Sequence, residues 1–146
     1  MSYLVDTNLL LRLVQSKNPH QREARRAFGI LRRQAESLGV IPQNLIEFWA
    51  VATRPAAHNG LDLSVVETAR QIGKLKALFK LLPDSPDIFP EWERLVLQHQ
   101  VSGKQAHDAR LVAAMKVHGI THLLTFNTAD FKRYDGITVV SPSSVK

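Results

Sequence analysis

Short apolar segments alternate with longer helical segments along this chain, and this alternation limits the fold more than any other feature of the sequence. The segments with the length and composition of buried strands are residues 2–6, 38–41, 79–82, 121–126 and 137–140. The segments with helical apolar spacing are residues 7–15, 19–33, 45–53, 64–78, 90–98 and 105–118. Strands that alternate with helices favour an α/β domain with a mostly parallel sheet, because parallel neighbours are joined by helical crossovers. The length of 146 residues favours a single domain over residues 1–146.

Two of the helix starts carry capping signals. Asn18 is suited to cap a helix that has Pro19 as its first residue and Gln21 three positions after the cap. Ser64 and Glu67 have the spacing of a capping box. We therefore expect one helix to begin at Pro19 and another directly after Ser64.

The composition excludes several classes of chemistry. The chain has no cysteine, which rules out disulfide bonds, thiolate zinc sites, iron–sulfur clusters and cysteine nucleophiles. It carries 19 Lys and Arg residues against 13 Asp and Glu residues, and the net charge of +6 fits either a polyanionic partner or a basic surface that only keeps the protein soluble. No apolar run approaches the roughly 18 residues that span a bilayer, and no basic segment precedes one near the N-terminus. We therefore expect a cytoplasmic protein without membrane contacts.

Common catalytic and nucleotide-binding motifs are absent. There is no Gly-x-Gly-x-x-Gly, Gly-x-Ser-x-Gly or His-Glu-x-x-His pattern. The pair Gly103-Lys104 is not part of a phosphate loop, because Gln98 and Gln105 stand where that motif needs Gly and Ser or Thr. The six histidines show no metal-ligand spacing. These absences leave the acidic residues as the main candidates for chemistry.

Two carboxylates stand in apolar surroundings in the first third of the chain. Asp6 ends a buried strand and opens a helix, so it is either a site residue or an ordinary helix cap. Glu47 lies in the most apolar helical segment, where a charged group needs compensation. The alternative for Glu47 is a capping box with Asn44, three residues earlier.

Two further carboxylates occur near the end of the chain. Asp108 shares a helix face with Leu111, Val112 and Met115, so it is aligned with apolar core positions. Its alternative role is to stabilise the helix dipole in the first turn. Asp130 follows the strand that ends near residue 126, where the alternative is a cap formed with Asn127.

The predicted topology brings these carboxylates to one edge of the sheet. Asp6 and Asp130 follow strands, and Glu47 and Asp108 lie in the first turns of helices that run antiparallel to the strands. Four converging carboxylates repel one another unless a cation compensates them. Oxygen-only ligands favour Mg²⁺ or Mn²⁺, and such an ion activates water for attack on a phosphate. With the basic net charge, this pattern predicts hydrolysis of a nucleic-acid phosphodiester.

Four motifs of this chain, in this order and spacing, resemble the PIN-domain ribonucleases. They are Val5-Asp6-Thr7-Asn8 after the first strand, Glu47 in an apolar helix, His107–Ala114, and Leu124–Phe131. The likeness covers the whole chain and is greatest to the VapC-type toxins of bacterial toxin–antitoxin pairs. It implies a three-layer α/β/α fold and Mg²⁺- or Mn²⁺-dependent endonuclease activity on RNA. It also implies a homodimer that a small antitoxin protein holds in check.

The resemblance also assigns roles to individual residues. Asp6 and Asp108 match the main metal ligands of the family, and Glu47 matches its next acidic position. Both Asn127 and Asp130 fall in the motif of the fourth acidic position. We choose Asp130 as the fourth metal-site and catalytic residue, with Asn127 and Thr125 as supporting residues near the metal.

Other functions fit the sequence less well or remain open. A phosphatase of the haloacid-dehalogenase type needs an aspartate at the position of Asn8, and a receiver domain needs paired acidic residues after the first strand. A PIN-like module that binds RNA or a partner without cleaving remains an alternative, as does a nuclease that processes RNA and is not a toxin. The arginines between Arg22 and Arg33 either guide RNA or form a solvated helix face, and their spread around the helix favours the solvated face.

Overall fold

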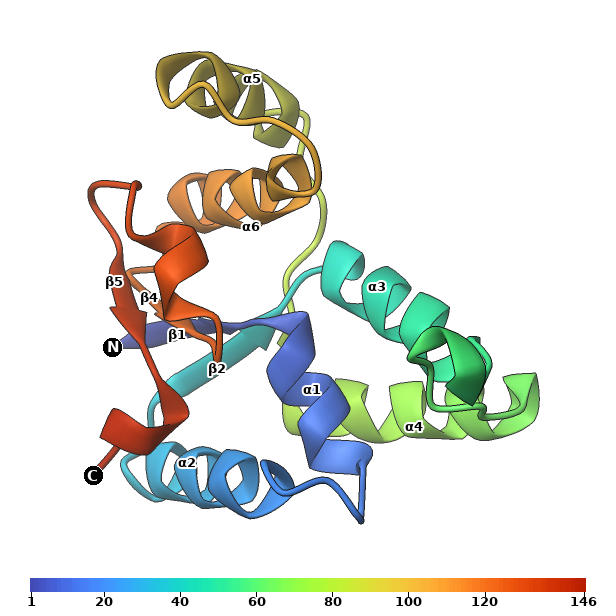
Figure 1. Cartoon of the computed structure of the whole chain (residues 1–146). Helices are drawn as coiled ribbons and strands as arrows, with labels where there is room; N and C mark the ends of the chain where they lie inside the picture. The colour runs from blue at the N-terminus through green and yellow to red at the C-terminus, as the bar shows by residue number, and fades with distance from the viewer.

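The central feature of the fold is a five-stranded sheet in which every neighbouring pair of strands is parallel. The computed structural model describes residues 1–146. The strands are β1 (Ser2–Val5), β2 (Ser37–Val40), β3 (Lys80–Leu81), β4 (His122–Leu124) and β5 (Thr138–Val140). The spatial order β3-β2-β1-β4-β5 reverses direction at β1, so the boundary between β1 and β4 is a topological switch point (Figure 1).

Helices cover both faces of the sheet, which confirms the expected three-layer α/β/α arrangement (Figure 1). They are α1 (Thr7–Val14), α2 (Gln21–Arg33), α3 (Pro42–Thr53), α4 (Val65–Leu78), α5 (Ile88–Gln98) and α6 (Gln105–His118). Tyr3 and Val5 of β1 pack into a core with α1, α2, α3 and α4, and Leu4 packs into a second core with α5 and α6. This division follows from the strand period of two, which turns successive side chains to opposite faces.

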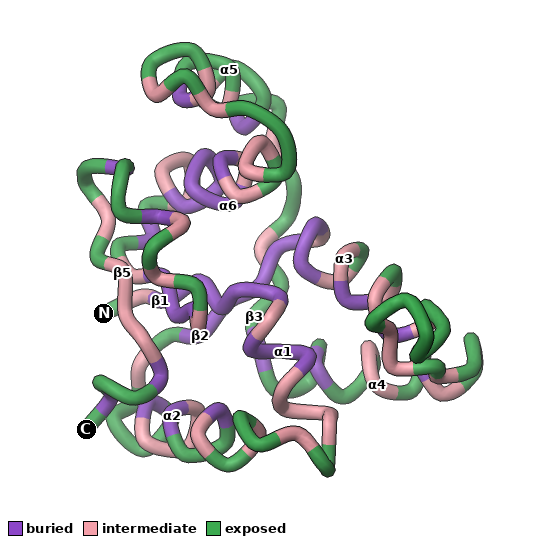
Figure 2. The backbone as a smooth tube through the Cα atoms, viewed as in Figure 1, coloured by how far each residue is buried: buried purple, intermediate pink, exposed green.

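Burial is concentrated around the central strand. The tube in Figure 2 is buried along β1 and at the start of α1, and along much of α6. Gly119 ends α6 with a φ of 69°, a left-handed conformation that glycine adopts without strain. None of the six helices is long and apolar enough to cross a membrane.

One predicted helix start is wrong and another is confirmed. The helix α2 begins at Gln21 and not at Pro19, because the Asn18 side chain accepts a hydrogen bond from the His20 N–H at 2.9 Å and closes a turn outside the helix. Ser64 caps α4 as predicted, since its hydroxyl accepts a hydrogen bond from the backbone N–H of Glu67 at 3.0 Å.

The start of α3 also differs from the prediction, and the difference bears on Glu47. The helix begins at Pro42, where proline is favoured because it has no N–H group and the N–H groups of the first turn have no partner within the helix. Asn44 accepts a hydrogen bond from the N–H of Ile41 at 2.8 Å and so closes the turn at the helix start. The predicted alternative of a capping box between Asn44 and Glu47 is therefore wrong.

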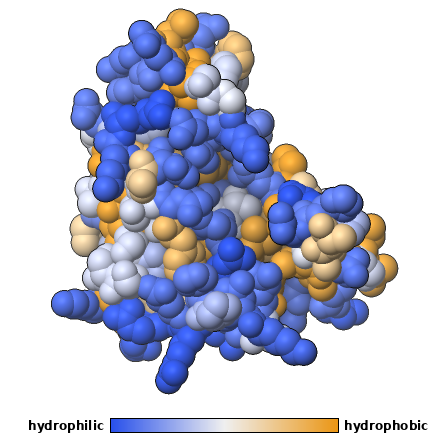
Figure 3. Space-filling view, in the orientation of Figure 1, coloured by the Kyte–Doolittle hydropathy of each residue, from blue (hydrophilic) through white to orange (hydrophobic).

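The outer surface is mostly hydrophilic, with a few apolar patches. In Figure 3 apolar side chains gather over α5 and over the region of α3 and α4. The large apolar side chains that are exposed on these helices are Ile46, Val65, Val66, Leu78, Phe89 and Leu97. The five arginines of α2 are all exposed, which agrees with a solvated helix face.

Candidate active site

Asp6 is held at the switch point by hydrogen bonds to both of its carboxylate oxygens. The backbone N–H of Thr7 donates to Oδ1 at 2.7 Å, and the hydroxyl of Thr125 donates to Oδ2 at 2.7 Å. Asp6 directly follows β1 and Thr125 directly follows β4, so the two central strands bring these residues together. Asp6 is thus a helix cap, as the simpler interpretation proposed, and also a buried carboxylate with a fixed orientation.

Glu47 is connected to the same place through a chain of hydrogen bonds. The hydroxyl of Thr7 donates to Oε1 of Glu47 at 2.9 Å and accepts from the side-chain amide of Asn44 at 3.2 Å. Asn44 is fully buried, and its own oxygen is held by the N–H of Ile41. Thr7 therefore contacts the carboxylates of Asp6 and Glu47 through its backbone and its side chain respectively.

Sequence reasoning did not select Thr7 or Asn44 as site residues. A signal for each is visible in retrospect: Thr7 directly follows Asp6, and Asn44 lies three residues before Glu47, on the same side of α3. Nothing local indicates that these two residues meet, since they are 37 positions apart in the sequence.

The four predicted carboxylates influence one another electrostatically, and we call Asp6, Glu47, Asp108 and Asp130 the acidic cluster. Burial raises the pKa of Asp108 to about 7, and the three other carboxylates add to this increase. Burial also raises the pKa of Asp6 to about 6, although its hydrogen bonds from Thr125 and Thr7 act in the opposite direction. No member of the acidic cluster forms a salt bridge. The cluster therefore concentrates negative charge that no cation of the chain neutralises.

The segment after β4 supplies Asp130 and the two predicted supporting residues. Asp130 lies in a short 3-10 helix, Thr128–Phe131, and Asn127 does not cap this helix through its side chain. Asn127 is exposed, and its backbone N–H donates to the Thr125 hydroxyl at 3.0 Å. Thr125 thus contacts Asp6 directly, whereas the Asn127 backbone supports Thr125. The carboxylate of Asp130 acts electrostatically on Asp6 and Asp108, so the choice of Asp130 over Asn127 stays a prediction.

The acidic cluster has the donor chemistry of a divalent-cation site, but its carboxylates do not lie close enough together to form one. Its donors are all carboxylate oxygens, which are the ligands that Mg²⁺ and Mn²⁺ prefer. As the side chains stand, no three of the acidic or histidine side chains are close enough together to hold an ion. An ion therefore fits these residues by charge and donor type, and binding it requires the carboxylates to move closer together.

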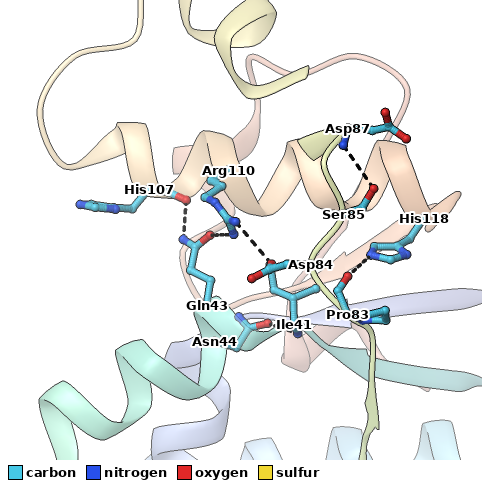
Figure 4. Close-up of polar contacts among 10 residues, drawn as sticks. All are labelled: Ile41, Gln43, Asn44, Pro83, Asp84, Ser85, Asp87, His107, Arg110 and His118. Carbon is cyan, nitrogen blue, oxygen red and sulfur yellow. Dashed lines mark hydrogen bonds and ion pairs between the residues drawn. The ribbon is translucent and has the colours of Figure 1, made fainter. Parts of the chain in front are cut away.

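A pocket adjoins the acidic cluster at Glu47. It has a volume of about 370 Å³ and is lined by Gln43, Ile46, Glu47, Asp84, His107 and Arg110. Figure 4 shows that Arg110 lies between the side chains of Gln43 and Asp84. The site consequently has two parts, a carboxylate edge and a neighbouring polar pocket.

Solved structures of similar fold come from several bacteria. A toxin–antitoxin complex from Klebsiella pneumoniae is 25% identical, covers 96% of this chain and 97% of that chain, and has a TM-score of 0.67. VapBC2 from Rickettsia felis, solved with a promoter DNA fragment, is 13% identical over 97% of this chain and 98% of that chain, with a TM-score of 0.75. VapC20 from Mycobacterium tuberculosis, a toxin that cleaves the sarcin–ricin loop, is 16% identical over 83% and 86%, with a TM-score of 0.63.

Comparison at the level of sequence families agrees with the fold. No curated protein matches the chain. The PIN domain family matches residues 3–137, a range that contains all four members of the acidic cluster as well as Thr7, Asn44 and Thr125. With this match and the three-layer parallel fold, the chain belongs to the PIN domain family.

Proposed function

We propose that this protein is an endoribonuclease that depends on Mg²⁺ or Mn²⁺ and acts as the toxin of a toxin–antitoxin pair. The observation that carries the proposal is the acidic cluster at the switch point, whose carboxylates raise the pKa of Asp6 and of Asp108 and form no salt bridge. A module that only bound RNA would gain nothing from four carboxylates facing a phosphate backbone. A divalent ion makes the same four carboxylates compatible with a polyanionic substrate.

Each member of the acidic cluster has a proposed role. Asp6 and Asp108 would hold the ion, with Glu47 and Asp130 completing the ligand set. When bound, such an ion lowers the pKa of water and stabilises negative charge on a phosphate under attack. Glu47 keeps Oε2 free of hydrogen bonds within the chain, and this oxygen is suited to orient a water molecule or accept its proton. Asp130 is the alternative residue for that step.

The similar structures support RNA as the substrate and an antitoxin as the partner. The Klebsiella structure is a toxin–antitoxin complex, and VapC20 is a toxin that cleaves the sarcin–ricin loop. The net charge of +6 favours binding of RNA at long range. Exposed apolar side chains on α3, α4 and α5 are suited to contacts with an antitoxin or with a second copy of the chain.

The nuclease proposal is tested by cleavage of a fluorogenic RNA by the purified protein in Mg²⁺, in Mn²⁺ and in EDTA. We expect cleavage with either ion and none in EDTA. An Asp6→Asn protein purified in the same way controls for contaminating nucleases and should be inactive. Cleavage that persists in EDTA, or equally in Asp6→Asn, would contradict the proposal. A folded wild-type protein that neither cleaves RNA nor binds metal would instead be a binding module.

The toxin assignment has a separate test in growing cells. Induced expression of the wild-type chain should arrest growth, and expression of Asp6→Asn should not. Co-expression of a short open reading frame found directly upstream should restore growth. An active nuclease whose expression leaves growth unchanged would instead be an RNA-processing enzyme.

Replacing Thr7 with valine should weaken cleavage by about tenfold or more, because a hydrogen bond to a charged group is worth roughly 1.5–3 kcal/mol. Valine keeps the shape of the side chain but removes the donor to Glu47 and the acceptor for the buried Asn44. Urea unfolding should also show a loss of about 1–3 kcal/mol. Thr7→Ser retains the hydroxyl and should behave like the wild type. Equal cleavage rates for Thr7→Val and Thr7→Ser would show that this chain of hydrogen bonds does not position Glu47.

A further inference from the structure

The pocket beside Glu47 is braced by hydrogen bonds between α3 and α6. The Gln43 side chain donates through Nε2 to the backbone oxygen of His107 at 2.8 Å and accepts through Oε1 from Arg110 at 3.2 Å. Both hydrogen-bonding ends of this largely buried amide are therefore occupied (Figure 4). The contacts fix the pocket wall in advance of any ligand, which lowers the entropic cost of binding.

Arg110 is held in place while keeping donors free for a ligand. Its two Nη atoms donate to Gln43 and, at 3.3 Å, to Oδ1 of Asp84. A guanidinium group has five N–H donors in a planar fork, so three of them have no partner within the chain. Asp84 is about half exposed, and its carboxylate retains acceptor positions toward solvent. The pocket thus offers unused donors beside unused acceptors.

The charge of the pocket decides what kind of group fits it. The charged lining consists of two carboxylates, Glu47 and Asp84, and one guanidinium, of which only Asp84 forms an ion pair with Arg110, so these three groups are net negative. A phosphate would be repelled by this lining. An uncharged nucleobase suits it better, because the edge of a base presents N–H donors to a carboxylate and O or N acceptors to a guanidinium. Ile46, which is 69% exposed, adds an apolar surface against which a base can pack.

We propose that this pocket binds the nucleobase next to the scissile phosphate and that Arg110 sets the base preference of cleavage. The inference rests on the proposed ribonuclease function, since Glu47 belongs to both the pocket and the acidic cluster. A volume of about 370 Å³ is large enough for one base. The alternative is that Arg110 and Asp84 only tie the segment after β3 to α6, in which case their loss would change stability and leave base preference intact.

The first test maps the cleavage sites of the wild type and of Arg110→Ala on the same RNA. We expect the wild type to favour one base beside the cut and Arg110→Ala to reduce that preference by about tenfold. Arg110→Lys should not restore it, because an ammonium group lacks the planar fork. Asp84→Asn should also alter the preference. The matched control is Arg94→Ala, which removes the same charge from an ion pair on α5 outside the pocket and should leave the preference unchanged.

The second test does not require cleavage, so it separates this inference from the proposed function. Labelled RNA pentanucleotides that differ only in the central base are titrated into Asp108→Asn and Asp108→Asn/Arg110→Ala, with binding followed by fluorescence anisotropy. Loss of about tenfold in affinity for one base, with the others nearly unchanged, supports the base pocket. An equal loss for all four bases, or none, overturns it. An absence of base preference in the wild type overturns it as well.

Discussion

Asp108→Asn is expected to reduce RNA cleavage more than about 100-fold, because even outer partners of metal ligands cost 10- to 100-fold when they are removed. The same change should make the metal-free protein more stable at pH 7.5, by about 1 kcal/mol for this partly exposed group. Burial and the three other carboxylates raise the pKa of Asp108 to about 7, so its negative charge destabilises the folded state. Cleavage rates and urea unfolding in EDTA measure the two effects.

The combination of the two effects is what identifies a functional site. Replacing a residue that served only the fold would lower the stability and the activity of the protein together. Asp135→Asn is the matched control, because Asp135 is an exposed aspartate outside the acidic cluster, and this variant should change neither quantity. Metal-dependent cleavage that survives in Asp108→Asn would remove Asp108 from the proposed site.

In EDTA the protein should become less stable as the pH rises from about 4 to 7. The folded-state pKa of Asp6 is about 6, above its ordinary value of 3.8, and that of Asp108 is about 7. Below pH 3.8 both groups are protonated in the folded and unfolded chains. Between pH 3.8 and the folded-state pKa values, the unfolded chain releases these two protons while the folded chain still holds them. The free energy of unfolding therefore falls until the folded chain has released them too. For Asp6 the loss is on the order of 3 kcal/mol.

The measurement is urea unfolding at several pH values for the wild type and for Asp6→Asn. The difference between the two proteins cancels the titrating groups that do not interact with Asp6, and it should grow as the pH rises through the coupled titration of Asp6 and Asp108. Mg²⁺ added at pH 7.5 should restore stability to the wild type, since a ligand that binds only the folded state stabilises it. A difference that does not vary with pH would mean that the Asp6 charge is already compensated.

Much of the fold could be predicted because its signals are local. The helix over Gln105–His118 agrees at both ends with its sequence pattern, since Gly119 is the only residue there suited to the left-handed end. The predicted start of α2 differs from the observed start by two residues, because the Asn18 side chain closes a turn and does not cap the helix. A helix cap and a turn just before a helix use the same kinds of residue, so sequence alone does not distinguish them.

The place that the sequence predicts for Asp6 and Asp108 follows from topology. Asp6 follows a central strand and Asp108 lies in the first turn of a crossover helix, and parallel topology brings such positions to one edge. The hydrogen bond between Thr7 and Asn44 was not predictable, because it depends on how α1 packs against α3. The pocket was not predictable either, because its walls come from three separate parts of the chain: α3, α6 and the segment after β3.

We propose that divalent metal binding joins carboxylates that repel one another in this structure. A titration of the metal-free protein with Mn²⁺, followed by calorimetry at pH 7.5, tests it most directly. Wild-type protein should bind Mn²⁺, Asp6→Asn should bind it at least about tenfold more weakly, and Asp135→Asn should match the wild type. If the wild type binds no Mn²⁺, or if Asp6→Asn binds it equally well, the acidic cluster is not the metal site.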